Sequence, residues 1–172
     1  LSIEVARGLF GELWFLKTFA EQEYGRSQAL LSWVGPLGSA QDFVFPDFKA
    51  FEVKTQQPSS DLVKISSVNQ LEYDGSLFLV KYRIANSKSP NFGKSLANIV
   101  QEIRKSSLEN SEVKDFDNKL SMLDLNLDDP NATEIYFSLE GPKFYSASMP
   151  GFPKLSSKDI PEGVRKTTYE VY

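Results

Sequence analysis

The sequence predicts an α/β protein in which helices flank one mixed β-sheet. Apolar side chains near the N-terminus recur at three- and four-residue steps, which is typical of an amphipathic helix. The middle of the chain holds short apolar runs separated by turn residues, as strands do. Helical and strand patterns then continue to alternate, with no internal repeat and no low-complexity tract. At 172 residues the chain suits a single domain, which we expect to span residues 1–172.

The first helix is expected over residues 3–20, where the apolar positions share one face. Gly8 and Gly11 lie inside it although each costs roughly 1 kcal/mol relative to alanine, so we expect a neighbouring element to pack very close. Tyr24-Gly25 ends the helix. Because the helical pattern begins almost at Leu1, we expect the chain to be a fragment of a longer one.

Strands dominate the next part of the chain. The expected elements are a strand at 29–34, a hairpin at 40–55, a strand at 63–65, a short helix at 67–73 and a strand at 76–84. Gly35-Pro36 closes the first of these, and Ser66 or Ser67 can cap the short helix. The last strand is strongly apolar, so we expect it at the centre of the sheet.

The C-terminal half mixes both kinds of element. The expected elements are a helix opened by Ser89-Pro90, a helix at about 112–124, a hairpin of 133–139 and 143–148, and a strand near 167–171. Serine can cap a helix and proline tolerates its first position, which favours the start at Ser89-Pro90. Gly141-Pro142 is the expected turn of the hairpin.

Two absences limit the chemistry, because the chain has neither cysteine nor histidine. Disulfides, thiolate zinc sites and thiol nucleophiles are excluded, as are Ser-His-Asp triads and HExxH metalloprotease sites. Any catalysis must use carboxylates, lysine, hydroxyls and hard metals bound through oxygen, such as Mg²⁺ or Mn²⁺. A chain without cysteine fits a reducing compartment, and we expect a cytoplasmic location.

Charge is unevenly distributed on this acidic chain, whose formal net charge is −4. Basic residues prevail between Lys81 and Lys105, and acidic residues prevail between Glu109 and Glu140. One positive face is therefore possible, but two ordinary solvated helix faces explain the split and are preferred on charge alone. No apolar run reaches the length of a membrane span and no signal-peptide pattern is present, so we expect no membrane partner.

Three ionisable residues interrupt the apolar hairpin at 40–55, namely Asp42, Glu52 and Lys54. Side chains alternate along a strand, so Glu52 and Lys54 point to one face. If Asp42 lies opposite Glu52, then Phe45 pairs with Lys49 around a three-residue loop. The register puts all three ionisable residues on one face. It puts on the other face an apolar set suited to a core: Phe43, Phe45, Phe51 and Val53.

Two acids opposite each other destabilise a sheet, so Asp42 and Glu52 need a compensating cation. Lys54 supplies one charge, and a divalent metal held by both carboxylates would satisfy the rest. Such a metal polarises a phosphoryl oxygen and acidifies a bound water, while the lysine orients the water or stabilises developing negative charge. The alternative is a charged patch that protects an edge strand from aggregation. The charges alone favour that alternative, but the apolar strands and the adjacent helices reverse the preference.

With its surroundings, this pattern resembles the PD-(D/E)xK nuclease superfamily. The matching residues are Asp42, Glu52-Val53-Lys54, the preceding Gly8-Leu9-Phe10-Gly11-Glu12-Leu13 and the following Ile65-Ser66-Ser67-Val68-Asn69-Gln70-Leu71. More narrowly, the chain resembles PD-(D/E)xK proteins of bacterial restriction-like and phage-defence neighbourhoods. The resemblance covers roughly residues 5–85. It implies a restriction-endonuclease-like αβββαβ core with a mixed sheet flanked by helices, followed by C-terminal helices and a hairpin.

The resemblance also implies roles for individual residues. Asp42 and Glu52 match the metal ligands and Lys54 matches the catalytic lysine. Glu12 matches an additional acid that many members contribute to the metal site, although a solvated helix acid explains it nearly as well. Gln70 matches the polar residue on the helix after the motif, although a surface glutamine explains it slightly better.

Two departures from the family pattern concern the motif aspartate. Gln41, rather than proline, precedes Asp42. The literal Pro46-Asp47 pair falls at the expected turn tip, away from Glu52, so we do not take Asp47 as the motif residue.

These observations predict a Mg²⁺- or Mn²⁺-dependent DNA endonuclease of a bacterial restriction or defence system. Its expected partners are DNA and other subunits or domains of such a complex. The alternative is a nuclease fold without catalysis that binds DNA or assembles a complex, which the acidic composition favours. Another metal-dependent hydrolase acting on nucleotides is a third option, although the chain lacks a glycine-rich phosphate loop for ATP.

Overall fold

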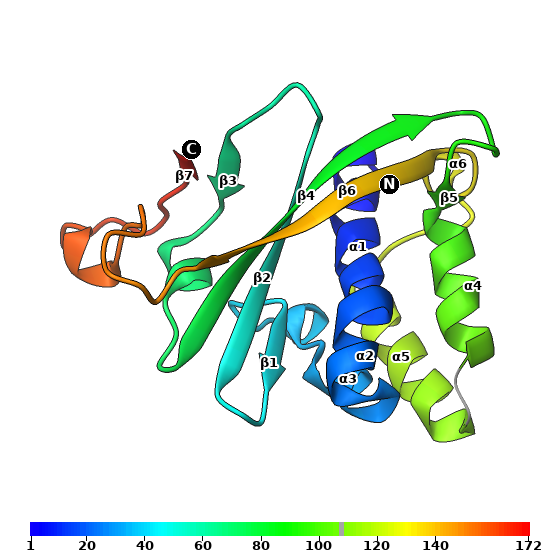
Figure 1. Ribbon diagram of the computed structural model, residues 1–172, viewed down its shortest axis with the longest axis horizontal. Helices are drawn as coiled ribbons and strands as arrows, with labels where there is room; N and C mark the ends of the chain where they lie inside the picture. Colours follow the sequence, from blue (N-terminus) through cyan, green and yellow to red (C-terminus); the bar gives the residue numbers. More distant parts are fainter. Residues whose placement is uncertain (107–108) are drawn as a thin grey trace.

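The protein is seen here in a computed structural model that describes residues 1–106 and 109–172 (Figure 1). Helices cover one face of a five-stranded sheet, and a separate two-stranded sheet lies beyond the other face. The α/β class with a mixed sheet flanked by helices, predicted from the sequence, is confirmed. Among the described residues, no helix combines the length and the apolar character that crossing a membrane requires.

The main sheet has the strand order β1-β2-β4-β6-β5. Its strands are β1 (Phe43–Phe45), β2 (Lys49–Gln56), β4 (Ser76–Ser87), β5 (Lys94–Ser95) and β6 (Tyr136–Ser146). Strands β2 and β4 run parallel, whereas the other neighbours are antiparallel, so the sheet is mixed. The apolar strand β4 is central, as its sequence predicts. The two-stranded sheet joins β3 (Val63–Ile65) and β7 (Tyr169–Val171).

The predicted N-terminal helix is one continuous helical segment with a local change of winding. It comprises α1 (Ile3–Phe15), a π-helical turn η1 (Leu16–Ala20) and α2 (Glu21–Tyr24). A Cβ at Gly11 would overlap the methyl group of Thr55 on β2, so this glycine lets α1 lie close to the sheet. The same expectation was wrong for Gly8, which has open space around it.

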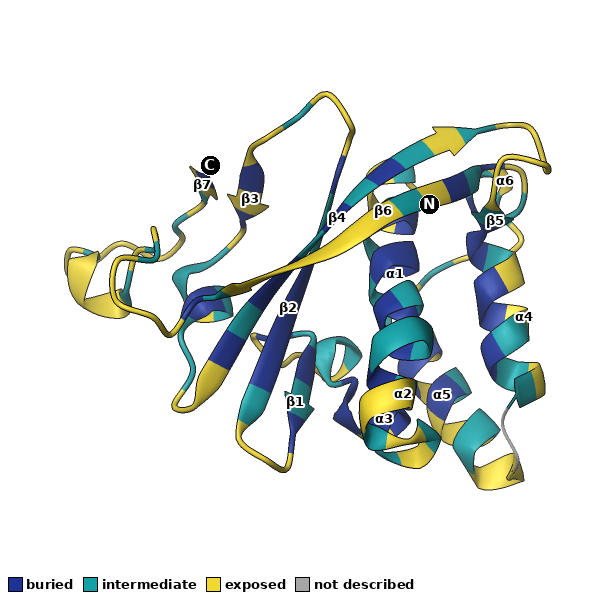
Figure 2. Ribbon diagram, in the orientation of Figure 1, coloured by how far each residue is buried: buried dark blue, intermediate teal, exposed yellow. Residues whose placement is uncertain are grey.

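The hairpin register predicted from side-chain alternation is confirmed. Its pairs are Phe43 with Phe51, Val44 with Ala50 and Phe45 with Lys49. The phenylalanine face joins the large core under the helices, and the Ala50 face joins a smaller core under β3 and β7. Figure 2 shows β2 buried along most of its length between these two layers.

The strand expected at 29–34 was wrong, because these residues belong largely to helix α3 (Arg26–Ser32). Ala29 and Leu30 are buried whereas Leu31 is exposed, which fits one face of a helix. A short apolar run does not by itself distinguish the two structures. Only Trp33 makes a β-bridge, to Phe43.

The helix expected to open at Ser89-Pro90 starts later, as α4 (Leu96–Ser106). The chain first pairs with β6 through β5. The helix then begins where Ser95 and Asn98 cap each other: each side chain accepts a hydrogen bond from the other's backbone N–H, at 3.0 and 3.2 Å. The helix expected at about 112–124 is confirmed as α5 (Asn110–Met122), and a short α6 (Pro130–Thr133) follows.

The hairpin expected around Gly141-Pro142 was also wrong, because both halves form one strand, β6. Its register against β4 shifts between Lys81 and Arg83, opposite this dipeptide. Beyond its two pairs with β5, β6 is an edge strand, where a proline without an N–H is tolerated. The short helix expected at 67–73 is a 3₁₀ turn, η3 (Val68–Leu71), capped by Ser67.

Candidate active site

The residues singled out in the sequence come from four parts of the fold. Glu52 and Lys54 lie on β2, and Asp42 directly precedes β1. Gln70 lies on η3, beyond the sheet face that carries Glu52, and Glu12 lies on α1. Asp42 continues the register of the hairpin by one position past the Phe43–Phe51 pair and is therefore opposite Glu52.

Asp42 is held by backbone groups on both sides. Its carboxylate Oδ2 accepts a hydrogen bond from the Val53 N–H at 2.7 Å. Its carbonyl oxygen accepts the N–H groups of Val34 and Gly35 at 2.9 and 3.0 Å. Burial raises the pKa of Asp42 to about 6, against the opposing effects of the Lys54 ammonium and the Val53 N–H. The side chain is therefore fixed in place before any ligand arrives.

Glu52 is a carboxylate buried without adequate partners. Its exposed fraction is 0%. The Lys54 ammonium lies 2.7 Å from Oε1, but neither carboxylate oxygen receives a hydrogen bond of ordinary geometry. Burial, followed by the charge of Asp42, raises the pKa of Glu52 to about 8, although the Lys54 ammonium and the Asp42 backbone N–H oppose the shift. A buried, incompletely paired acid destabilises a fold, so this position calls for an additional cation.

Gln70 holds the ammonium of Lys54. The lysine Nζ donates to the Gln70 side-chain oxygen at 3.2 Å, and the same oxygen accepts the Ser66 N–H at 2.8 Å. Lys54 thus contacts Glu52 on one side and Gln70 on the other. Its flexible side chain is restrained in a single position beside the two acids.

Gln41 is a supporting residue to which the sequence analysis gave no role. Its side chain is buried, and its Nε2 donates to the carbonyl oxygens of Asn69 and Glu72 at 2.7 and 2.9 Å. These bonds tie the segment before Asp42 to the turn that carries Gln70. The available signal was the replacement of the usual proline by a long amide side chain next to the motif aspartate.

Glu12 is linked to the site through charge and through Trp33. Its Oε2 accepts a hydrogen bond from the Trp33 indole N–H at 2.9 Å. Burial and then the charge of Asp42 raise the pKa of Glu12 well above its ordinary value, and Glu52 adds to the effect. In residues 1–106 and 109–172, no three His, Cys, Asp or Glu side chains form a group that could hold a metal ion. Glu12 therefore interacts with the two acids without joining them in a preassembled cluster of three.

The carboxylate oxygens of Asp42 and Glu52 are suitable ligands for a hard divalent cation. The Glu52 oxygens are buried without a hydrogen bond, and the opposing Asp42 uses one oxygen for a backbone N–H. Carboxylate ligands suit Mg²⁺ and Mn²⁺ rather than softer metals. Asp47, by contrast, lies exposed in the hairpin turn, where Lys49 Nζ donates to its Oδ2 at 2.7 Å. The Pro46-Asp47 pair thus lies at the turn, as expected.

Comparison with known proteins identifies the family of the chain. A family model described as "Putative PD-(D/E)XK family member, (DUF4420)" matches residues 1–172. Searches of curated proteins and of solved structures gave no match. Since the family model extends over all 172 residues, the chain belongs to this PD-(D/E)XK family, whose description implies a nuclease-like fold.

Proposed function

We propose that this chain is a Mg²⁺- or Mn²⁺-dependent DNA endonuclease domain of a bacterial restriction or defence system. Asp42 and Glu52 are the proposed metal ligands, Lys54 is the catalytic lysine, Gln70 positions that lysine, and Glu12 is an additional acid. The observation that carries the proposal is Glu52, which is fully buried with both oxygens lacking a hydrogen bond, opposite Asp42 and beside Lys54. This arrangement costs stability, and a metal site gives it a use.

The side chains divide the work of phosphodiester hydrolysis. A bound divalent ion would supply Lewis acidity toward the phosphate and acidify a coordinated water. Asp42 and Glu52 would hold that ion through their carboxylate oxygens. Lys54 places a positive charge where negative charge develops on the phosphate in the transition state. Gln70 and the Ser66 N–H keep the lysine from turning away.

The proposal is tested with purified protein, plasmid DNA and Mg²⁺ or Mn²⁺. We expect nicking or cutting by the wild type and a loss on the order of 10²-fold or more in Glu52→Gln and in Lys54→Ala. Asp47→Asn is the matched control, because it removes an exposed acid from the same hairpin. Activity that persists in Glu52→Gln and Lys54→Ala would assign the cleavage to another site or to a contaminant.

The second candidate is a nuclease fold that binds DNA or assembles a complex without catalysis. The observation that favours it is the absence, in the part of the chain that the structure describes, of a preassembled group of three metal-binding side chains. Divalent-ion binding distinguishes the two candidates. If calorimetry detects no binding that depends on Asp42 and Glu52, the non-catalytic function is the better account.

A further inference from the structure

Basic residues continue across the sheet from the proposed catalytic lysine. Lys54 on β2 pairs with Lys81 on β4, and Lys81 pairs with Lys143 on β6. Residues paired directly across neighbouring strands point to the same face, and adjacent strands lie about 4.8 Å apart. The three residues therefore form a row, called the lysine row below, on the face that carries Glu52.

The outer part of this row lies open. Lys81, Arg83 and Lys143 line a hollow of about 200 Å³ together with Glu140 and Gly141. Lys143 is exposed. Among the described residues, no carboxylate forms an ion pair with Lys81 or Lys143. Neighbouring like charges destabilise a sheet, so an anionic ligand would relieve this repulsion.

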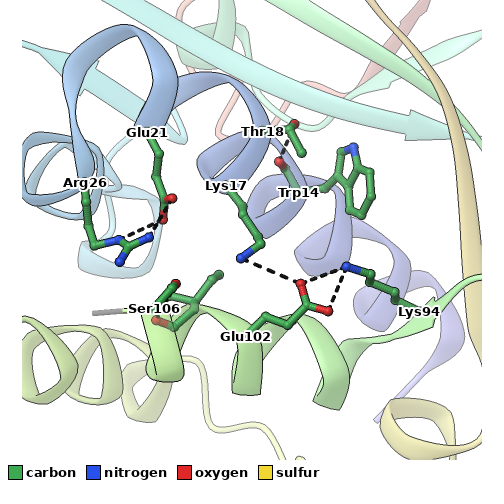
Figure 3. A network of polar contacts seen from close by, with 9 residues as sticks. Trp14, Lys17, Thr18, Glu21, Arg26, Lys94, Glu102 and Ser106 are labelled. Carbon is green, nitrogen blue, oxygen red and sulfur yellow. Dashed lines mark hydrogen bonds and ion pairs between the residues drawn. The ribbon is translucent and has the colours of Figure 1, made fainter. Parts of the chain in front are cut away.

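Three basic residues on the helical side, in contrast, form ion pairs within the protein. Figure 3 shows Lys17 and Lys94 converging on Glu102, with ion-pair distances of 3.7 and 2.7 Å. Arg104 pairs with Asp117 at 2.8 Å. The basic stretch noted between Lys81 and Lys105 is therefore divided between two layers. Of this stretch, Lys81 and Arg83 on β4 lie on the face of the candidate active site.

An exposed acid, Asp61, occupies Arg83 at the end of the lysine row. Asp61, on the connection between β2 and β3, forms an ion pair with Arg83 at 2.6 Å. Its backbone carbonyl oxygen also accepts a long hydrogen bond from Lys81 Nζ, at 3.5 Å. Both partners of the ion pair are substantially exposed, so a phosphate could replace the Asp61 carboxylate at small cost.

An aromatic side chain flanks the same row. Tyr145 pairs with Leu79, which in turn pairs with Glu52, so the tyrosine lies in the adjacent row on the same face. It is 39% exposed and borders a hollow of about 130 Å³ whose lining also includes Lys81 and Phe152. An exposed ring beside a cation suits base stacking next to a phosphate contact.

We infer that the lysine row, extended by Arg83, is the track along which a DNA phosphodiester backbone crosses the sheet to reach Glu52 and Lys54. This inference rests on the proposed function. A row of cations matches a ligand that carries a row of negative charges, such as a phosphodiester backbone. The neighbouring tyrosine favours a nucleic acid over a polyanion without bases. The track also reconciles DNA binding with a net charge of −4, because the lysine row and Arg83 gather four basic residues on one face.

The test is fluorescence anisotropy in EDTA, which prevents cleavage, with a labelled DNA duplex that carries a single-stranded overhang. Lys81→Ala/Lys143→Ala should weaken binding about tenfold or more and reduce the slope of log K against log salt by roughly 2, because two phosphate contacts are lost. The control is Lys105→Ala, which removes an exposed lysine from α4 in the helical layer. Asp61→Asn should tighten binding about threefold by freeing Arg83. Misfolding does not produce such a gain.

The inference is overturned if the double variant binds with wild-type affinity and salt slope, if Lys105→Ala has an equal effect, or if the wild type does not bind DNA at low salt. Unchanged affinity in Asp61→Asn would remove Arg83 from the track. Failure of the proposed function has a different signature. Binding through the lysine row without any metal-dependent cleavage would leave the inference standing and refute the nuclease proposal.

Discussion

At the scale of single residues, stability and the proposed function oppose each other at Glu52. A carboxylate with an exposed fraction of 0%, whose oxygens receive no hydrogen bond of ordinary geometry, is a costly group to keep in a fold. Lys54 offsets part of this cost, and Asp42 adds to it through its own charge. A bound cation, as proposed, would correct this imbalance and offset the cost of the two acids.

Neutralising Glu52 should therefore stabilise the metal-free protein. For Glu52→Gln in EDTA at pH 8, we expect the free energy of unfolding to rise by about 1–3 kcal/mol, measured by urea denaturation. The same variant should lose cleavage activity. Asp47→Asn, which removes an exposed acid bonded to Lys49, should not stabilise the protein. A loss of stability in Glu52→Gln would show that the buried charge is already well compensated.

The raised pKa values also predict how stability depends on pH. Folding raises the pKa of Glu52 from 4.5 to about 8 and that of Asp42 from 3.8 to about 6. At a pH between its unfolded and folded pKa values, each carboxyl group binds more protons in the folded state than in the unfolded state. The metal-free protein therefore loses stability as pH rises from about 4 to about 8. To isolate this effect, the free energy of unfolding of the double variant Asp42→Asn/Glu52→Gln is subtracted from that of the wild type at pH 5, 6.5 and 8. If this difference stays constant or increases as pH rises, the raised pKa values of Asp42 and Glu52 are refuted.

At the scale of elements, the hairpin could be predicted from the sequence, but the helix, the long-range hydrogen bonds and the edge strand around it could not. Alternation of large phenylalanines with smaller or charged residues determines the register, because a slip by one residue would turn Phe43 and Phe51 away from the large core under the helices. Residues 29–34 lack such alternation, so a helix and a strand explain them equally well. Gln41 acts through carbonyl groups some thirty positions away in sequence, at distances that no local pattern reveals. The continuity of β6 likewise depends on its position at the sheet edge, where Pro142 is tolerated.

Removing the amide of Gln41 should loosen the turn that carries Gln70. We expect Gln41→Ala to lower the free energy of unfolding by about 1–2 kcal/mol, because two carbonyl oxygens lose their donor. It should also lower kcat more than it raises KM, since Lys54 becomes less restrained. Gln57→Ala is the control, because Gln57 is exposed. Equal kinetics in the two variants would remove Gln41 from the positioning of Lys54.

The contact between α1 and β2 gives a matched pair of glycine substitutions. Gly11→Ala should destabilise the fold by about 1–3 kcal/mol, because its Cβ would overlap the methyl group of Thr55. Gly8→Ala has free space and should be neutral or stabilising by up to about 1 kcal/mol. Combining Gly11→Ala with Thr55→Ser removes the clashing methyl and should restore stability. Thermal denaturation of the four proteins measures all three effects, and a Gly11→Ala variant as stable as the wild type would contradict the close contact.

At the scale of the whole molecule, the sheet separates two environments. The helical side holds the large apolar core, and there Lys17 and Lys94 both pair with Glu102. The opposite side holds the candidate active site, the lysine row and the smaller core under β3 and β7. The charge split seen in the sequence could not reveal this division, because Lys81 and Arg83 are close in sequence to Lys94 and Arg104, whose side chains pair with acids on the helical side of the sheet.

The central claim is that Asp42 and Glu52 bind a divalent ion, and calorimetric titration with Mn²⁺ at pH 8 tests it most directly. Binding is expected in the wild type and in Asp47→Asn, and it should be lost in Asp42→Asn and in Glu52→Gln. Glu12→Gln measures in the same experiment what the additional acid contributes. The account is contradicted if the wild type shows no binding, or if both carboxylate variants bind Mn²⁺ as tightly as the wild type.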